Sequence, residues 1–472
     1  MVQDMAKKNA SFLFYLVSGL LTILVGLYLE SVSTTPFLAV LGGMLALQIC
    51  CLNYHFNKDR FVTPLFIFSV MYSGYVLGAF YYSVSDGYFG KFLSFMPLGR
   101  GEVETSLVWA IIYASICYLS FVAGYSFFDR KKIGKIGFDL SPFQRFVAGN
   151  YIFLAAPLLI VGGCYWYYIS VTIAGSLLNS FIYFQLFPHF IAEHKLSTLP
   201  YLLYYSGVHI WLLGIILSKK RIGILFLLVL TLGFIIAMST ARITISVTYI
   251  LSQLMLLYLV FERYRKKIVV STFALISCAF VLFFLRELSN YYYLDSVNDL
   301  ELDYARSIIG GGNVADLQQL VIVFKSFNYD GSLLGSSYFD WLRNSIGEYF
   351  GYQASSVGLK IHDLYVPAGS GAPTPGAIGE AYANFNFVAP LFMYFAGLAV
   401  SGICFYCEKS RNLFVLYSYS VFLICFVFMY PKVDSTMIVN FFWGCVPTLV
   451  ILFCYYILFL LLPFKKESVS SR

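Results

Sequence analysis

The sequence predicts an all-α polytopic membrane protein with about twelve transmembrane helices and one large extracytoplasmic loop that contains short helices. Hydrophobic residues make up 60% of the 472 residues, and charged residues only 12%. A typical soluble domain carries about 25% charged residues. Apolar runs of about 20 residues recur along the chain, which is the length at which a helix spans the hydrocarbon core of a bilayer. The alternating segments of about 10 residues that are typical of a membrane β-barrel are absent.

The predicted spans lie close together, except at one long interruption. They cover approximately residues 11–30, 36–55, 62–82, 104–128, 147–173, 199–217, 221–239, 241–261, 267–285, 386–407, 412–430 and 437–462. Three regions follow: spans one to nine in residues 1–285, the large loop in 286–385, and spans ten to twelve with the tail in 386–472. The loop is too long to lack structure, and its pattern predicts short helices around 313–327 and 336–352. Residues 174–198 are predicted to form an amphipathic helix at the membrane interface.

Charge sorting orients these spans. Most of the 31 Lys and Arg residues lie in alternate connections and at the two ends of the chain. The positive-inside rule then makes both termini cytoplasmic and places the large loop outside. Lys7 and Lys8 precede an apolar segment without a small-residue cleavage site, which predicts a retained span. This charge distribution predicts that the protein interacts with the lipid bilayer and does not bind nucleic acid. All ten cysteines fall in apolar runs, as expected of hydrophobic helix residues rather than of a disulfide framework.

Arginines on the outer side run against the orientation bias and need a physical reason. Arg242 lies between two spans with almost no connection, Arg286 closes the ninth span, and Arg306 and Arg343 lie in the large loop. The alternatives are structural: Arg242 could snorkel to the headgroups, and the others could pair with neighbouring carboxylates. As a set, their planar guanidinium groups predict binding of a phosphate-bearing, lipid-linked substrate.

The stretch GSGAPTPGAIGEAYANFNF, residues 369–387, marks the return of the loop to the membrane. Pro375 suits the first turn of a helix, with Thr374 as its cap. A helix from there to Cys407 exceeds the hydrocarbon thickness, so its first turns stand outside the lipid or in a cavity. Glu380 and Asn384, four residues apart, then face that space together. Glu380 serves there either in binding or as a general base, or only as an acid that favours a helix start.

Two more acid–base candidates lie in the loop. His362 adjoins Asp363, although neighbouring residues in a chain rarely face each other. Glu348 follows Arg343 and Asn344 by about one turn and could pair with either of them. Asp299, Glu301 and Asp303 fit a solvated acidic strand or turn better than a cation site. The sequence contains no GxSxG, HExxH or P-loop motif.

The whole pattern resembles the Wzy-type O-antigen polymerases, which join lipid-linked oligosaccharide repeat units. The resemblance rests on the many-span layout with one late outer loop, on Arg242 and Arg286, and on PTPGAIGEAYANFNF at 373–387. It implies a GT-C-like glycosyltransferase in the bacterial inner membrane, with its active site facing the periplasm. The donor and the acceptor are repeat units on undecaprenyl diphosphate, and a chain-length regulator is a further implied partner. The resemblance also implies that neither a metal nor a cofactor is needed. Some family members have a second Arg-containing outer loop, whereas residues 174–198 contain no Arg.

The resemblance also assigns roles to residues. Arg242, Arg286, Arg343 and Arg306 are expected to bind the diphosphate and stabilise its departure. Glu380 is the first choice for removing the acceptor proton, followed by His362 and Glu348. Asn384 and Tyr382 are expected to contact the substrate.

Two other functions remain open. An O-antigen ligase, or another glycosyltransferase that uses a lipid-linked glycan, would share the arginines and differ in its acceptor. A lipid-linked oligosaccharide flippase can also have twelve spans, but such proteins have short connections and charges buried in mid-span. The long outer loop and the nearly uncharged spans favour chemistry at the membrane surface.

Overall fold

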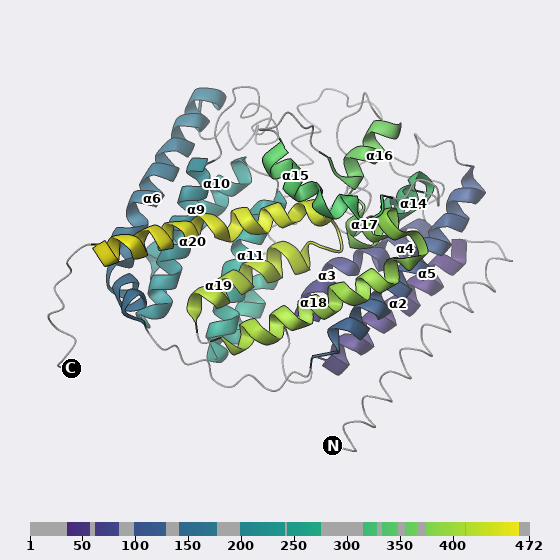
Figure 1. Ribbon diagram of the computed structural model, residues 1–472, viewed down its shortest axis with the longest axis horizontal. Coiled ribbons are helices and arrows are strands. Elements are labelled where there is room, and N and C mark those ends of the chain that lie inside the picture. Colours follow the sequence, from purple (N-terminus) through teal and green to yellow (C-terminus); the bar gives the residue numbers. More distant parts are fainter. Residues whose placement is uncertain are drawn as a thin grey trace, which may run out of the picture. The chain divides into compact units, whose positions relative to one another are not determined.

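The computed structural model of the protein is helical throughout the part of the chain that it describes (Figure 1). That part comprises residues 35–56, 62–84, 99–128, 141–176, 199–240, 243–274, 315–327, 333–347, 355–365, 374–410 and 412–461. The chain divides into two compact units. Unit 1 comprises Met1–Ile133, Glu301–Lys409 and Phe426–Val439, and unit 2 comprises Gly134–Leu300, Ser410–Cys425 and Asn440–Arg472.

Six helices in the described ranges are long and apolar enough to cross a membrane. They are Phe37–Phe56, Pro64–Val84, Gly101–Tyr125, Pro142–Thr172, Gly376–Lys409 and Gly444–Leu461. Four apolar helices are shorter: Leu202–Leu217, Ile224–Ile236, Thr248–Val260 and Leu413–Phe428. The described residues are therefore all-helical, as expected, and these helices are consistent with a polytopic membrane protein. The expected span at 11–30, most of the one at 267–285 and the expected helix at 174–198 lie outside the described residues, apart from their edges.

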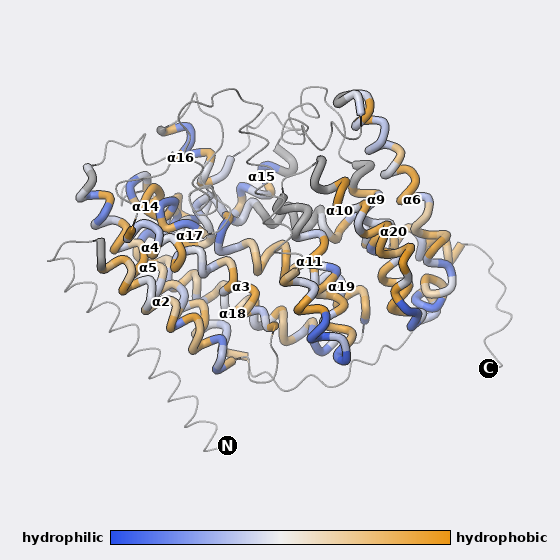
Figure 2. Tube along the Cα trace, turned by 180° about the vertical axis from the view of Figure 1, so that it is seen from behind, coloured by the Kyte–Doolittle hydropathy of each residue, from blue (hydrophilic) through white to orange (hydrophobic). Residues whose placement is uncertain are grey.

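Unit 1 contains the helices α2 (Thr35–Phe56), α3 (Pro64–Tyr72), α4 (Gly74–Val84), α5 (Arg100–Tyr125) and α18 (Ala389–Lys409). The expected span 62–82 begins as its sequence dictates, because the Thr63 hydroxyl accepts the Phe66 N–H at 3.2 Å and Pro64 occupies the first turn. Its core is aromatic: the Phe68 and Phe121 rings stack with centroids 3.8 Å apart. Figure 2 shows α2 and α18 as hydrophobic along most of their length, whereas α15 and α16 carry polar residues.

Helices α5 and α18 pack along each other through two glycines. A Cβ atom at Gly397 would lie 2.0 Å from the Phe121 carbonyl oxygen, and one at Gly124 would lie 1.9 Å from the Tyr394 carbonyl oxygen. Small residues at such a crossing let two helix backbones approach closely, which is a main source of packing energy between helices in a bilayer. The crossing therefore requires glycine at both positions.

Gly397→Ala is expected to lower the thermal unfolding temperature of the purified protein. The added methyl group must push α5 and α18 apart, and overpacking of this kind costs about 1–3 kcal/mol. Gly43→Ala is the matched control, because a Cβ atom at this helical glycine meets nothing within 4 Å. This control is expected to be neutral or slightly stabilising. Equal melting temperatures for the two variants would contradict the close packing of α5 against α18 at Gly397.

The described parts of residues 315–385 in unit 1 fold into short helices. These are α14 (Leu317–Ser326), the 3₁₀ turn η4 (Ser336–Phe339), α15 (Asp340–Gly347), α16 (Val357–Tyr365) and α17 (Gly376–Phe385). The helices expected around 313–327 and 336–352 are thus confirmed within the described ranges, whereas α16 was not expected.

The expectation of one unbroken helix from Pro375 to Cys407 is wrong. Helix α17 ends at Phe385, a 3₁₀ turn follows as η6 (Asn386–Val388), and α18 begins at Ala389. Asn386 has φ +48°, a left-handed conformation that an α-helix does not accommodate. Thr374 is not the cap either. The helix begins at Gly376, and its Ala377 N–H is satisfied by the Tyr430 carbonyl at 2.9 Å.

Asp316 begins α14 from a buried position. Its Oδ1 atom accepts the Gln318 N–H at 3.0 Å and the Tyr82 hydroxyl at 3.2 Å. The side chain is almost completely enclosed, and burial raises the pKa of Asp316 from its usual 3.8 to about 7, against the lowering effect of these two hydrogen bonds. The folded protein therefore holds a proton on Asp316 at pH values where the unfolded chain has lost it.

Asp316→Asn is expected to stabilise the protein at pH 7.5 and to change little at pH 4. A raised carboxyl pKa lowers the free energy of unfolding as pH rises through the range from about 4 to 7, by up to about 4 kcal/mol for a shift of about three pKa units. Asparagine keeps the capping oxygen and cannot ionise. Melting temperatures of both proteins across this pH range test the prediction. A constant difference between them would contradict it.

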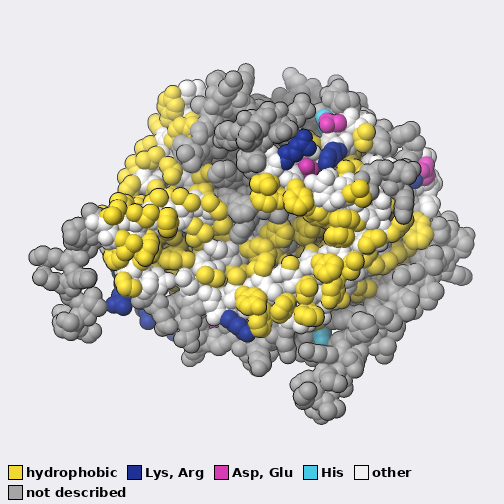
Figure 3. All heavy atoms as spheres, in the orientation of Figure 1, with side chains coloured by type: hydrophobic (Ala, Val, Ile, Leu, Met, Phe, Trp, Pro, Cys, Tyr) yellow, Lys and Arg dark blue, Asp and Glu magenta, His cyan; other side chains and the backbone are white. Residues whose placement is uncertain are grey.

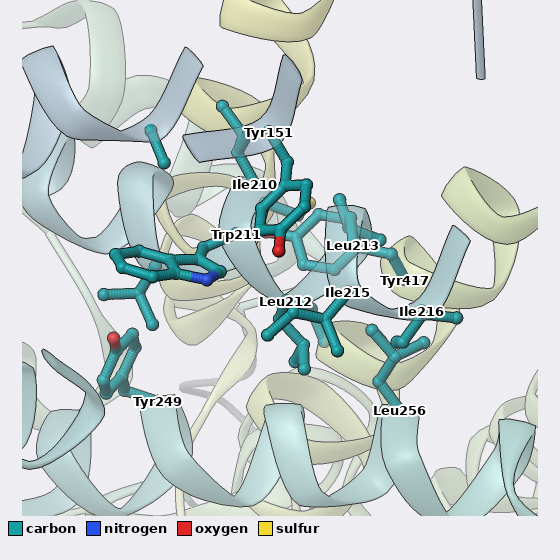
Figure 4. Close-up of a cluster of buried hydrophobic side chains, with 14 of the residues drawn as sticks. Tyr151, Ile210, Trp211, Leu212, Leu213, Ile215, Ile216, Tyr249, Leu256 and Tyr417 are labelled. Carbon is teal, nitrogen blue, oxygen red and sulfur yellow. The ribbon is translucent and has the colours of Figure 1, made fainter. Parts of the chain in front are cut away.

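Unit 2 contains α6 (Pro142–Ala174), α9 (Leu199–Leu217), α10 (Ile224–Thr240), α11 (Ile243–Val260), α19 (Leu413–Phe422) and most of α20 (Ile438–Leu461). A capping box starts α6, in which Ser141 and Gln144 bond each other's backbone N–H groups. Helices α6 and α9 pack along each other. Figure 4 shows the resulting core, with Leu212 and Leu213 of α9 among the side chains of Tyr151, Leu256 and Tyr417.

Candidate functional site

Glu380 is buried at a junction of three chain segments in unit 1. Its Oε1 atom accepts the Ser435 hydroxyl at 2.6 Å and the Ser337 hydroxyl at 2.9 Å. Its Oε2 atom accepts the Ser435 N–H at 2.7 Å. The residue has 0% exposure, so the expectation that it faces an open space is wrong. It also lies in the second turn of α17, which leaves little role for the helix dipole.

Asn384 completes the same network and is equally enclosed. Its Nδ2 group donates to the Ser337 hydroxyl oxygen and to the Glu380 carbonyl, both at 2.7 Å. Its Oδ1 atom accepts the Gly335 N–H at 2.9 Å. The shared helix face of Glu380 and Asn384 is confirmed, since both contact Ser337. This face binds the neighbouring protein segment and is closed to solvent.

The third segment, residues 429–436, closes the junction from the other side. Gly376 has φ +67°, and a Cβ atom there would lie 2.3 Å from the Pro431 carbonyl oxygen, so only glycine permits this approach. Asp434 lies close enough to Glu380 for the two carboxylates to repel each other. Burial raises the pKa of Asp434, while the Thr436 hydroxyl and N–H, which donate to its Oδ1 atom, lower it.

Helices α15 and α16 are held together next to this junction. The Asn344 Nδ2 group donates to the Ser355 carbonyl at 2.6 Å, and the Asn344 Oδ1 atom accepts the Ser355 N–H at 2.8 Å. Lys360 Nζ lies 3.3 Å from Asp340 Oδ2. Asp340 is almost fully buried, so this ion pair with its added contact to Ser355 fixes the two helices. Figure 3 shows basic and acidic side chains gathered over α15 and α16, above a hydrophobic surface along α18.

Arg343 and His362 are the expected site residues that lie near the protein surface. Arg343 is exposed on α15. His362 is partly exposed on α16, and its Nδ1 atom lies 3.3 Å from Asp363 Oδ1. The doubt about facing neighbours was therefore unfounded for this pair. When Nδ1 carries the proton toward Asp363, the ring is in the tautomer whose basic nitrogen is Nε2.

Tyr382 packs into an aromatic cluster instead of lining a solvent-facing surface. Its ring centroid lies 4.4 Å from that of Phe324 and 5.6 Å from that of Tyr113. Only 8% of the residue is exposed. Phe387, with its ring centroid 5.9 Å from that of Tyr382, is 73% exposed and extends this cluster to the surface.

The remaining expected site residues, Arg242, Arg286, Arg306 and Glu348, lie outside the described residues. The described part of the chain adds two residues that the sequence did not single out, Ser337 and Ser435, which supply all three donors to Glu380. Isolated serines far apart in sequence carry no local signal for such a role. No family model, curated protein or solved structure matches the chain.

Proposed function

We propose that this protein polymerises oligosaccharide repeat units carried on undecaprenyl diphosphate, at the outer face of a bacterial cytoplasmic membrane. The observation that carries the proposal is the junction at Glu380. Helix α17, which lies in the stretch at 373–387, directly precedes the long apolar helix α18. The junction ties α17 to the outer helices and to residues 429–436. In this topology about twelve helices span the bilayer, both termini are cytoplasmic, and α14 to α17 lie outside.

The proposed reaction needs an anion-binding group and a base. The acceptor hydroxyl oxygen attacks the anomeric carbon of the donor sugar, and the bond from that carbon to the diphosphate breaks, with the electron pair leaving on the diphosphate. Arg343 binds the departing charge. Arg242, Arg286 and Arg306 lie outside the described residues and keep the diphosphate-binding role that the resemblance implies. Repeat units on the same lipid serve as donor and acceptor, and the proposal requires no metal or cofactor.

Burial changes the proposed assignment of the base. A general base must come within hydrogen-bond reach of the proton that it removes. Glu380 is fully enclosed and its two oxygens already accept three hydrogen bonds. His362 is partly exposed and is oriented by Asp363. We therefore assign the base role to His362 and a positioning role to Glu380 and Asn384, which hold η4, and with it α15, in place.

Deleting the gene and resolving the surface polysaccharide on a gel tests the function. If the protein is a polymerase, the deletion strain is expected to lose the ladder of long chains, while single repeat units remain attached. Loss of all repeat units would instead indicate a flippase or a ligase, which are the competing assignments. Complementation with the intact gene must restore the ladder. A deletion strain with an unchanged ladder would contradict all three functions.

A further inference from the structure

Unit 2 contains a group of buried polar side chains that the proposed reaction does not use. His209 lies on α9, Tyr249 and Gln253 lie on α11, and between 3% and 7% of each residue is exposed. Within the part of the chain that the structure describes, His209 Nε2, both Gln253 amide atoms and the Tyr249 hydroxyl have no hydrogen-bond partner. Buried polar groups are almost always hydrogen-bonded to protein or to bound molecules, because leaving them unpaired is costly.

These side chains lie together. The ring centroids of His209 and Tyr249 are 5.5 Å apart. Gln253 follows Tyr249 by one helical turn, so both side chains project from the same face of α11. The Tyr249 hydroxyl and the Gln253 amide lie near each other but outside hydrogen-bond geometry. The unpaired polar atoms of the three side chains therefore lie in one region of unit 2, along α9 and α11.

The other nitrogen of His209 defines what this ligand must do. His209 Nδ1 lies 2.9 Å from the Tyr417 hydroxyl and 3.3 Å from the Thr448 hydroxyl. If Nδ1 accepts a hydrogen bond from one of these hydroxyls, Nε2 carries the ring hydrogen and needs an acceptor. If Nδ1 donates to one of them, Nε2 has a lone pair and needs a donor. A hydroxyl group satisfies Nε2 in either tautomer, and the Gln253 amide also offers both a donor and an acceptor.

The described surroundings of His209 favour a neutral ligand over an ion. The buried charged side chains among the described residues are Asp316, Asp340, Glu380, Lys432 and Asp434, and all of them belong to unit 1. An ion placed beside His209 would therefore have no buried counter-charge, and burying an unpaired charge is far more costly than burying a neutral polar group.

We propose that His209, Tyr249 and Gln253 form an intramembrane site for a neutral hydroxyl group, supplied either by water or by the headgroup of a lipid. The site is independent of the polymerase proposal, since it rests only on contacts inside unit 2. Polar side chains inside a membrane helix bundle commonly mark such functional sites.

Solid-state NMR of the full-length protein labelled with ¹⁵N-histidine tests the proposal. The chain has five histidines, so the His209 signals are assigned by their loss in His209→Phe. If water supplies the hydroxyl group, we expect polarisation transfer from water protons to His209 Nε2 in phosphatidylcholine vesicles, whose headgroups carry no hydroxyl group. If a lipid supplies it, we expect transfer only in vesicles that contain phosphatidylglycerol, and this transfer originates from the glycerol protons. A His209 ring that receives no transfer in either vesicle, and that resists exchange in D₂O, would overturn the proposal.

Gln253→Leu provides a second readout. If the amide contacts a bound hydroxyl group, the substitution is expected to weaken the transfer to His209 Nε2 and to leave the melting temperature unchanged or lower. If the cluster is dry, removing an unpaired amide raises the melting temperature and leaves the His209 signal unaltered, which would contradict the site. Ser252→Ala is the matched control, because the Ser252 hydroxyl already donates to the Tyr249 carbonyl at 2.8 Å. This control should change neither readout.

Discussion

Glu380→Gln is expected to keep a polysaccharide ladder, whereas Glu380→Ala is expected to lose both the ladder and much of the thermal stability. The glutamine carbonyl can still accept the Ser435 N–H, and its NH₂ group can donate to the two serine hydroxyl oxygens. Alanine leaves one N–H and two hydroxyl groups buried without their acceptor, at about 1–3 kcal/mol for each group. Ladder length in complemented cells and the melting temperature of the purified protein measure the two effects.

Two comparison variants separate positioning from catalysis at this residue. Ser435→Ala removes one donor and leaves the carboxylate in place, so it should lower the melting temperature and shorten the ladder in proportion. His362→Gln alters the assigned base on the exposed side of α16 and should stop polymerisation with little change in melting temperature. A Glu380→Gln protein that melts like the wild type and makes no ladder would return the base role to Glu380.

Helix positions were predicted from long apolar runs, and the exact starts of the helices were not. The expected span at 62–82 matches the start of α3, whereas the one expected at 147–173 begins later than α6, which starts at Pro142. Local caps set both starts, Thr63 with Pro64 for α3 and Ser141 with Gln144 for α6, because caps and prolines act within one turn. The long apolar runs also predicted the membrane class. Asn386 shows the limit of this reasoning: only its contacts with distant segments, including the bond from the Tyr113 hydroxyl to its carbonyl at 2.8 Å, stabilise a left-handed break inside a helical pattern.

The candidate site was predictable only in part, because its bonds join residues far apart in the chain. The spacing of Glu380 and Asn384 correctly predicted a shared face, but it could not show that Ser337 and Ser435 cover this face. An acid that precedes a membrane helix looks the same in sequence whether solvent or a serine hydroxyl surrounds it. Only the tertiary structure shows that Glu380 is buried, and this burial is the reason that we assign the base role to His362.

Arg343→Ala is expected to reduce polymerisation about 10²–10³-fold, the effect typical of removing one group that stabilises charge in a transition state. Arg343 is exposed on α15, so its truncation should shift the melting temperature little. Arg343→Lys should fall between the wild type and alanine, since lysine keeps the charge but lacks the planar fork that binds two phosphate oxygens at once. Repeat-unit transfer by the purified protein, with lipid-linked repeat units as donor and acceptor, measures the rates.

Lys325→Ala is the matched control for this experiment. Lys325 also carries a positive charge among the short helices α14 to α17, where it pairs with Glu102 in a partly exposed ion pair. Such pairs contribute about 0–1 kcal/mol, and Lys325 belongs to no part of the proposed anion-binding group. Its removal should leave the transfer rate unchanged, so a loss confined to Arg343 would indicate a specific contact with the diphosphate. If both alanine variants slow the transfer equally, Arg343 acts only through the general positive charge of these helices. If neither slows it, Arg343 takes no part in binding the diphosphate.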